Sequence, residues 1–199
     1  IVLTGVDITA WGKDIEERKN LGELVELILR ENPTLSRLRL SSLDISEIDE
    51  KLIRLFKKEH RLMPHLHLSL QSGNNMILKR MKRRHSREAS VELCKELKEA
   101  RPELTFGADL IVGFPTENEE MFNDTLSLIN ECDITWLHIF PYSSRQGTPA
   151  SRMPQVERET ILRRSQRLRK SAAERKKMHF SNLVNKRISV LMETEFKGR

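Results

Sequence analysis

Two short segments alternate leucines with polar residues of types that bind ligands. In residues 37–41 the polar members are Arg37, Arg39 and Ser41, and in residues 65–71 they are His65, His67, Ser69 and Gln71. A guanidinium group suits a carboxylate, and imidazole, hydroxyl and amide groups offer hydrogen bonds. Because successive side chains of a strand point to opposite faces, each polar set lies on one face. These faces are candidates for binding a polar ligand.

A third segment combines a strand, a tight turn and a helix. The apolar run Thr105–Val112 ends at Gly113, and Pro115 then prevents the strand from continuing. Thr116 and Glu119 have the spacing of a capping box, and apolar residues at helical intervals follow them. This order predicts one unit of a parallel α/β fold.

The rest of the chain repeats this unit. Strands are expected near residues 1–6, 37–41, 65–71, 105–112, 134–140 and 188–192, and helices near 21–30, 48–56, 91–97, 116–132 and 157–180. Right-handed crossovers then give a parallel sheet that is either open or closed into a barrel. Such folds bind ligands at the carboxyl ends of their strands, which is where Asp109, Ile111 and Gly113 lie.

The alternation also predicts which face the ligand meets. If the leucines pack under the helices, the arginine and histidine side chains line the interior, where burial is costly unless a ligand meets them. Asp109 shares its face with Thr105 and Gly107 and joins the same cavity. The alternative is that these are edge strands with one solvated face. Because further strands are expected on both sides, the interior site is favoured.

Composition narrows the class of protein. The chain has 199 residues, 38% of them hydrophobic, which is enough for a sizeable core. No apolar run is long enough to span a bilayer and no signal peptide is visible, so we expect a cytoplasmic protein without membrane contact.

Cys94 and Cys132 are far apart in sequence and have apolar neighbours, which favours small buried side chains over a metal site. The first residue, Ile1, already reads as part of a strand, so a piece of a longer protein is expected.

Basic residues are clustered in two places. The net charge of +6 suggests an anionic partner. The first cluster lies in residues 79–87, and the second lies on the helix expected at 157–180. Phosphate binding is favoured for the first cluster, whereas a solvated helix face is an equally good interpretation of the second.

A metal site is an alternative interpretation of the histidines. His65 and His67 lie on one face of a strand, as in metal-dependent hydrolases. Such a site needs further ligands, and only Asp109 and His138 are available at strand positions. No metal site is therefore predicted.

Several motifs in order resemble one family. They are residues 3–7 (LTGVD), 39–42 (RLSS), 67–73 (HLSLQSG), 78–83 (LKRMKR), 109–115 (DLIVGFP) and 140–150 (FPYSSRQGTPA). Together they resemble the radical S-adenosylmethionine methylthiotransferases over nearly the whole chain. Within that family they look most like enzymes that act on threonylcarbamoyladenosine at position 37 of tRNA. Enzymes acting on isopentenyladenosine in tRNA or on ribosomal protein S12 are the close alternatives.

The resemblance implies a fold and a chemistry. It implies a partial (β/α)6 barrel lacking its first unit in residues 1–183, and the start of a TRAM RNA-binding module in residues 184–199. A reduced [4Fe-4S] cluster would cleave S-adenosylmethionine to a 5′-deoxyadenosyl radical, and a methylthio group would be added to C2 of the base. The cluster-binding Cys-x3-Cys-x2-Cys loop of the family is absent from these residues, so this chain alone is expected to be inert. A binding module for RNA or nucleosides without redox chemistry is the rival from another class.

The resemblance also implies roles for residues. Gly5 and Asp7 would lie near the methionine amino group, and Arg39 would pair with the methionine carboxylate. The remaining cofactor contacts would be Ser41, Gln71 and Asp109 at the ribose, Ile111, Val112 and Gly113 against adenine, and Phe140 and Tyr142 closing the adenine side. The tRNA anticodon loop and an electron donor are the implied partners. The expected RNA contacts are Lys79, Arg80, Lys82, Arg83, Arg84 and Arg145.

Overall fold

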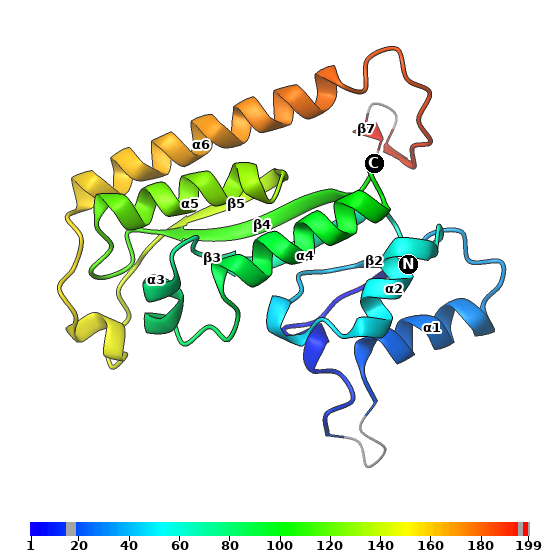
Figure 1. Cartoon of the computed structure of the whole chain (residues 1–199), viewed down its shortest axis with the longest axis horizontal. Coiled ribbons are helices and arrows are strands. Elements are labelled where there is room, and N and C mark those ends of the chain that lie inside the picture. The colour runs from blue at the N-terminus through cyan, green and yellow to red at the C-terminus, as the bar shows by residue number, and fades with distance from the viewer. Residues whose placement is uncertain (15–18, 195–196, 199) are drawn as a thin grey trace.

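The computed structural model describes residues 1–14, 19–194 and 197–198 (Figure 1). Its strands are β1 (Val2–Leu3), β2 (Arg39–Leu40), β3 (His65–Gln71), β4 (Thr105–Val112), β5 (Ile134–Pro141), β6 (Met192–Thr194) and β7 (Lys197–Gly198). Its α-helices are α1 (Leu21–Glu31), α2 (Glu50–Lys58), α3 (Asn75–Arg80), α4 (Arg87–Ala100), α5 (Glu119–Glu131) and α6 (Arg158–Ser181). Three short 3₁₀ helices are η1 (Ile8–Ala10), η2 (Ile45–Glu47) and η3 (Pro149–Arg152).

The first five strands are parallel and follow one another in sequence order. β1 pairs with β2, and β3, β4 and β5 form a second parallel group in that order. Two isolated parallel bridges, between Leu38 and Leu62 and between Leu43 and Leu68, join the groups. The expected parallel α/β fold is therefore confirmed, and the sequential strand order is that of a partial barrel.

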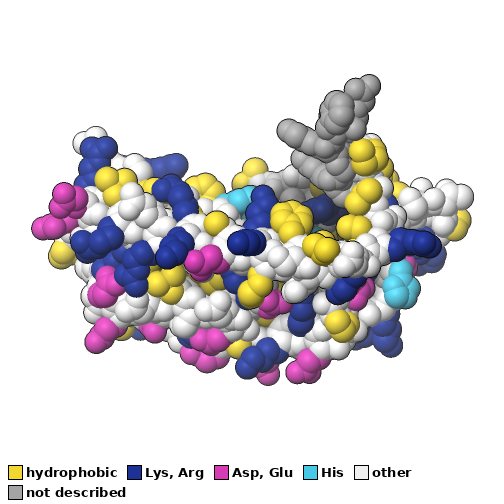
Figure 2. Space-filling view, turned by 90° about the horizontal axis from the view of Figure 1, so that it is seen from above, with side chains coloured by type: hydrophobic (Ala, Val, Ile, Leu, Met, Phe, Trp, Pro, Cys, Tyr) yellow, Lys and Arg dark blue, Asp and Glu magenta, His cyan; other side chains and the backbone are white. Residues whose placement is uncertain are grey.

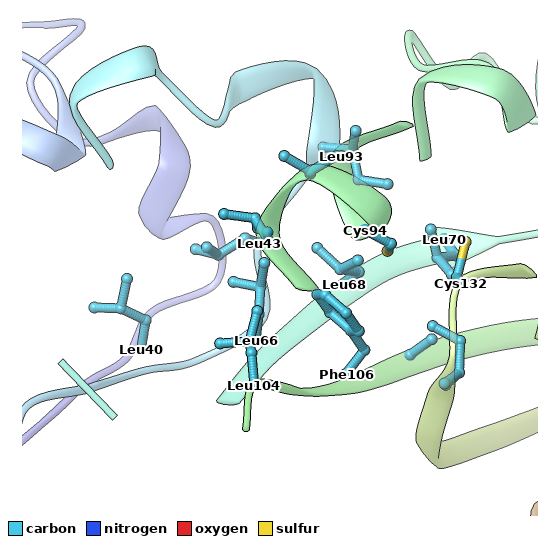
Figure 3. Close-up of a cluster of buried hydrophobic side chains, with 14 of the residues drawn as sticks. Leu40, Leu43, Leu66, Leu68, Leu70, Leu93, Cys94, Leu104, Phe106 and Cys132 are labelled. Atoms are coloured by element: carbon cyan, nitrogen blue, oxygen red, sulfur yellow. The ribbon is translucent and has the colours of Figure 1, made fainter. Parts of the chain in front are cut away.

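The core lies between the strands and the helices, and its leucines alternate as expected. Leu66, Leu68 and Leu70 of β3 are each no more than 1% exposed. They belong to one apolar cluster that includes side chains of α1, α2, α4, α5 and α6, and Figure 3 shows its central part around Phe106. Burial of this face turns the polar residues of β3 toward the other side of the sheet.

Helix α6 lies along the last strand of the sheet. Figure 1 shows it running beside α5 and β5 for most of its length. Leu168 is fully buried, and Arg175 donates a hydrogen bond from Nε to the carbonyl of Ile134 at 3.1 Å. No helix within the described ranges is both long and apolar enough to cross a membrane.

Three local expectations were wrong. Helix α5 is capped by Asn118, whose Oδ1 accepts from the N–H of Met121 at 2.9 Å, and not by Thr116. Thr116 instead adopts a left-handed conformation with φ 68°, because the chain turns sharply after Pro115. The helices expected from the sequence also did not include α3, which occupies Asn75–Arg80 and is capped by Asn74.

The third error concerns the end of the chain. A strand was expected at residues 188–192, but β6 begins only at Met192 and pairs antiparallel with β7. Ile188 and Val190 are about half exposed and have no neighbouring strand in the part of the chain that the structure describes. Phe196, which contributed to the expectation of a TRAM module, lies outside the described residues.

Candidate functional site

The polar face of the sheet brings together three side chains from three strands. Asp109 lies on β4, His67 on β3 and His138 on β5. Oδ1 of Asp109 is 3.0 Å from Nε2 of His67 and 3.2 Å from Nδ1 of His138. Because an ionised carboxylate only accepts hydrogen bonds, both imidazoles donate to it. The rings of His67 and His138 lie 4.9 Å apart between centroids.

His65 extends this cluster toward the beginning of β3. Its Nδ1 lies 3.1 Å from Oγ1 of Thr105, and its ring centroid is 6.4 Å from that of His67. Burial lowers the pKa of His65 to about 4, and the positive charge of Arg39 and the neighbouring His67 act in the same direction. Leu38 and Leu40 are buried in the core, which turns the side chain of Arg39 between them to the other side of β2.

The carboxylate of Asp109 is favoured in its ionised form. Burial acts to raise its pKa, but the hydrogen bonds and charges of His67 and His138 outweigh burial, so the pKa is lowered below its usual range. The polar face thus carries the negative charge of Asp109 beside the hydrogen-bond donors His67 and His138. Such a carboxylate can accept hydrogen bonds from the hydroxyl groups of a bound ligand.

The strand ends beside this cluster form tight turns. Gln71 closes β3 with φ 66°, and Gly113 follows β4 with φ 75°. The N–H of Gly113 donates to Oε1 of Glu117 at 3.0 Å. Across the turn, the rings of Phe114 and Tyr142 are 5.3 Å apart in an edge-on arrangement. The loops after β4 and β5 therefore meet at the carboxyl ends of these strands.

A buried ion pair holds the turn after β4. Glu117 is 5% exposed, and Nη1 of Arg164 on α6 lies 2.8 Å from its Oε1. Nη1 also donates to the backbone carbonyl of Glu117 at 3.0 Å. Burial raises the pKa of Glu117 above its usual value, although Gly113 and Arg164 oppose this. Arg164 belongs to the second basic cluster of the sequence, and its position four residues before the buried Leu168 places it on the inward face of α6.

The other residues expected to contact the cofactor differ in their burial. The side chain of Val112 is buried in the core under the helices, so only its backbone can face a ligand. Phe140 is half exposed, and Ile111 is its partner in the register of β4 and β5. Ser41 follows β2, and its Oγ is buried without a hydrogen-bond partner among the described residues. A buried hydroxyl without a hydrogen-bond partner is expected where a bound ligand would supply that partner.

The first strand ends at a separate hollow. Gly5 and Asp7 line a cavity of about 540 Å³ together with Trp11 and Lys13. Asp7 is the N-cap of η1, and its Oδ1 accepts from Thr9 Oγ1 at 2.7 Å. The structure therefore does not bring Asp7 into contact with the cluster around Asp109.

The expected RNA contacts divide into free and engaged cations. Lys79, Lys82 and Arg145 are exposed, and Arg84 is exposed while pairing with Glu47. Nη1 of Arg80 donates to Oγ1 of Thr116 at 2.6 Å. Nη2 of Arg83 donates at 2.9 Å to both Asp44 and the carbonyl of Ser69. Arg80 and Arg83 therefore connect the loops at the strand ends.

The His67, Asp109 and His138 cluster has the donor set of a metal site. One ligand atom from each residue lies within 4.8 Å of the others. Two histidines and one carboxylate suit zinc or iron. The two hydrogen bonds to Asp109 already satisfy these groups, so the geometry does not require an ion. Metal analysis of the purified protein for zinc and iron distinguishes the two interpretations.

A parallel α/β sheet in sequential order, with the polar side chains of His67, Asp109 and His138 together on one face, defines a partial barrel. The sequence matches the Radical SAM superfamily over residues 1–129, and the chain belongs to this superfamily. The fold agrees with coproporphyrinogen III oxidase from Escherichia coli, described as a radical SAM enzyme, with a TM-score of 0.62. That match is 20% identical and covers 80% of this chain and 38% of the other.

Curated relatives are more similar in sequence. The chain is 46% identical over 193 residues to the threonylcarbamoyladenosine tRNA methylthiotransferase MtaB of Rickettsia prowazekii, covering 97% of this chain and 46% of the relative. It is 36% identical over 204 residues to the tRNA-2-methylthio-N(6)-dimethylallyladenosine synthase of Bacillus subtilis, covering 100% of this chain and 39% of the relative. The resemblance to methylthiotransferases is confirmed. The chain spans less than half the length of these relatives.

The cysteines of this chain do not fit an iron–sulfur cluster. Such a cluster is held by several thiolates, whereas the chain contains only Cys94 and Cys132. Both are 1% exposed and lie in the core under the helices (Figure 3). These two thiols therefore do not supply the ligands of a cluster.

Proposed function

We propose that this chain is the core of a methylthiotransferase that adds a methylthio group to C2 of N6-threonylcarbamoyladenosine at position 37 of tRNA. The observation that carries the proposal is the 46% identity to MtaB over almost the whole chain. The polar interior around Asp109 supports it, because the reaction needs a site for a nucleoside cofactor. The dimethylallyladenosine enzymes, at 36% identity, are the second candidate.

S-adenosylmethionine is the proposed cofactor of the polar face. With a reduced [4Fe-4S] cluster, it would supply the radical that abstracts hydrogen. We assign its carboxylate to Arg39 and its ribose hydroxyls to Ser41, Gln71 and Asp109. The backbone of residues 111–113 would face adenine, and Phe140 and Tyr142 would close that side. The ionised Asp109 and the orphaned hydroxyl of Ser41 are the features that support this assignment.

The tRNA anticodon loop is the proposed substrate, and an electron donor is the proposed second partner. Lys79, Lys82, Arg84 and Arg145 are exposed cations near the strand ends and are suited to phosphate contacts. Arg80 and Arg83 would act in the same region by holding its loops. The hairpin of β6 and β7 would begin a TRAM module at residues 184–199, following the barrel of residues 1–183.

The substrate is tested by mass spectrometry of tRNA nucleosides. A strain lacking the gene, complemented with the full-length gene, should lose and then regain 2-methylthio-N6-threonylcarbamoyladenosine. Loss of the dimethylallyladenosine derivative instead would establish the second candidate. An unchanged nucleoside profile would contradict a role in tRNA methylthiolation and leave the nucleoside-binding module as the better explanation.

The cofactor site is tested by binding of S-adenosylmethionine to the full-length protein with its clusters loaded. Asp109→Asn should weaken binding about tenfold or more, because hydrogen bonds to a charged group contribute about 1.5–3 kcal/mol. Glu50→Gln is the matched control, since Glu50 has a 94% exposed side chain on α2. Equal affinity of both variants would contradict the assignment of Asp109.

A further inference from the structure

Helix α6 carries an unusual share of the positive charge of the chain. It contains nine lysines and arginines but only two glutamates, a formal charge of +7. The net charge of the whole chain is +6, so the remaining residues sum to a slightly negative charge. A large share of any attraction that this chain exerts on a large anion therefore comes from this helix.

Three of these cations are used to attach α6 to the barrel. They are Arg164, which pairs with Glu117 and Glu119, Arg167, which pairs with Glu119 and Asn123, and Arg175, which pairs with Asp133. These contacts explain the inward arginines without any ligand. They do not explain the cations on the opposite side of the helix.

Arg163, Lys170 and Lys177 form a stripe on the outward side of α6. Successive members are seven residues apart, which places them nearly in line along the helix with a rise of about 10.5 Å from one to the next. All three are exposed, and within residues 1–14 and 19–194 none has an ion pair with an acidic side chain. Figure 2 views the molecule from the side of α6 and shows many lysine and arginine side chains on this face.

Aromatic side chains beside the stripe indicate which kind of anion would bind there. Lys176 places its Nζ 5.4 Å from the ring centroid of Trp136 and 5.9 Å from that of Phe180. Phe180 is 50% exposed. Exposed rings beside cations suit RNA, in which bases stack on aromatic side chains while phosphates meet the cations.

A membrane surface is less suitable for this helix. A helix that lies on a membrane turns a continuous apolar face outward. In α6 the apolar residues Ile161 and Leu168 instead pack inward against the barrel core. The exposed apolar residues Leu162, Met178 and Phe180 lie near the two ends of the helix and do not form a continuous face. The outward face is predominantly polar, which leaves electrostatic binding of a soluble polyanion.

We propose that the Arg163, Lys170 and Lys177 stripe binds the phosphate backbone of the RNA substrate. The stripe begins near the carboxyl ends of the strands, because the N–H of Thr116 donates to the carbonyl of Pro154 just before α6 at 3.0 Å. It then extends for about 21 Å along the helix. An RNA whose target base reaches the polar face can thus lay its backbone along α6. The identification of this RNA as tRNA rests on the proposed function.

The test is the salt dependence of tRNA binding by the full-length protein. Arg163→Gln, Lys170→Gln and Lys177→Gln are combined in one variant, and an unmodified tRNA transcript is the probe. Loss of three phosphate contacts should lower the slope of log affinity against log salt by about two to three and weaken binding at least tenfold at moderate salt. The matched control combines Arg30→Gln, Arg54→Gln and Lys58→Gln on α1 and α2, which removes the same charge from exposed positions.

The outcomes separate this proposal from the proposed function. A reduced slope in the α6 variant together with a nearly unchanged slope in the control supports the stripe. Wild-type slopes in both variants, or equal losses in both, would overturn it while leaving tRNA binding intact. A wild-type protein that ignores tRNA but binds vesicles containing phosphatidylserine would overturn both proposals.

Discussion

Gly107 leaves the space that His67 occupies on the neighbouring strand. The two residues are partners in the register of β3 and β4, and a Cβ built on Gly107 would lie 2.5 Å from Nδ1 of His67. Nε2 on the other side of the ring reaches Asp109 at 3.0 Å. The imidazole is thus held between the backbone of β4 and a carboxylate of the same strand. A residue without a side chain is what allows the donor to face Asp109.

Gly107→Ala should displace His67 from Asp109. The added methyl group overlaps the ring and costs about 1–3 kcal/mol. We expect a lower midpoint of denaturant unfolding and weaker S-adenosylmethionine binding in the full-length protein. NMR signals of His67 and His138 should shift in the variant. Unchanged stability together with unchanged histidine signals would contradict the close packing of this pair.

Arg164→Met should destabilise the protein more than loss of an exposed arginine. It leaves the carboxylate of Glu117 buried without its cation, which typically costs about 3–5 kcal/mol. Glu117→Gln combined with Arg164→Met should recover part of this loss, because the buried charge is gone. Urea unfolding of both variants measures the effect, with Arg163→Met as the exposed control. A single variant no less stable than the control would disprove the importance of the ion pair.

The histidine cluster makes stability depend on pH. The pKa of His65 is about 4 in the folded state against 6.5 for the free side chain, chiefly because of burial. The unfolded chain therefore takes up the proton first, and stability present above pH 6.5 is lost as the pH falls toward 4. His65→Gln should flatten this part of the melting-temperature profile. Parallel profiles for wild type and variant would show that His65 does not titrate in this way.

Cys94 and Cys132 should be unreactive in the folded protein. A hydrogen bond with Cys132 and burial both raise the pKa of the Cys94 thiol, so little thiolate forms. A thiol reagent should label neither residue before denaturation and both after it, as peptide mass spectrometry can show. Rapid labelling of either residue under native conditions would place that thiol outside the core.

The alternation of leucines with polar residues was enough to predict which face of β3 is buried. It correctly predicted that Leu66 and Leu68 pack under helices while His67 faces the other way. This succeeded because the two-residue period of a strand is a local property of the chain. The parallel order of strands followed from the same kind of local pattern, with helices of ordinary length between successive strands.

Contacts between distant residues were decided only by the tertiary structure. His138 reaches Asp109 because the register of β5 on β4 makes the two residues partners. Arg83 and Arg164 read as surface cations in sequence, yet both donate to carboxylates on other elements. Charge is visible in a sequence, but whether a cation meets an acid or solvent depends on the packing of separate elements. The sequence by itself determined the faces of the strands, and the folded chain determined which side chains meet across them.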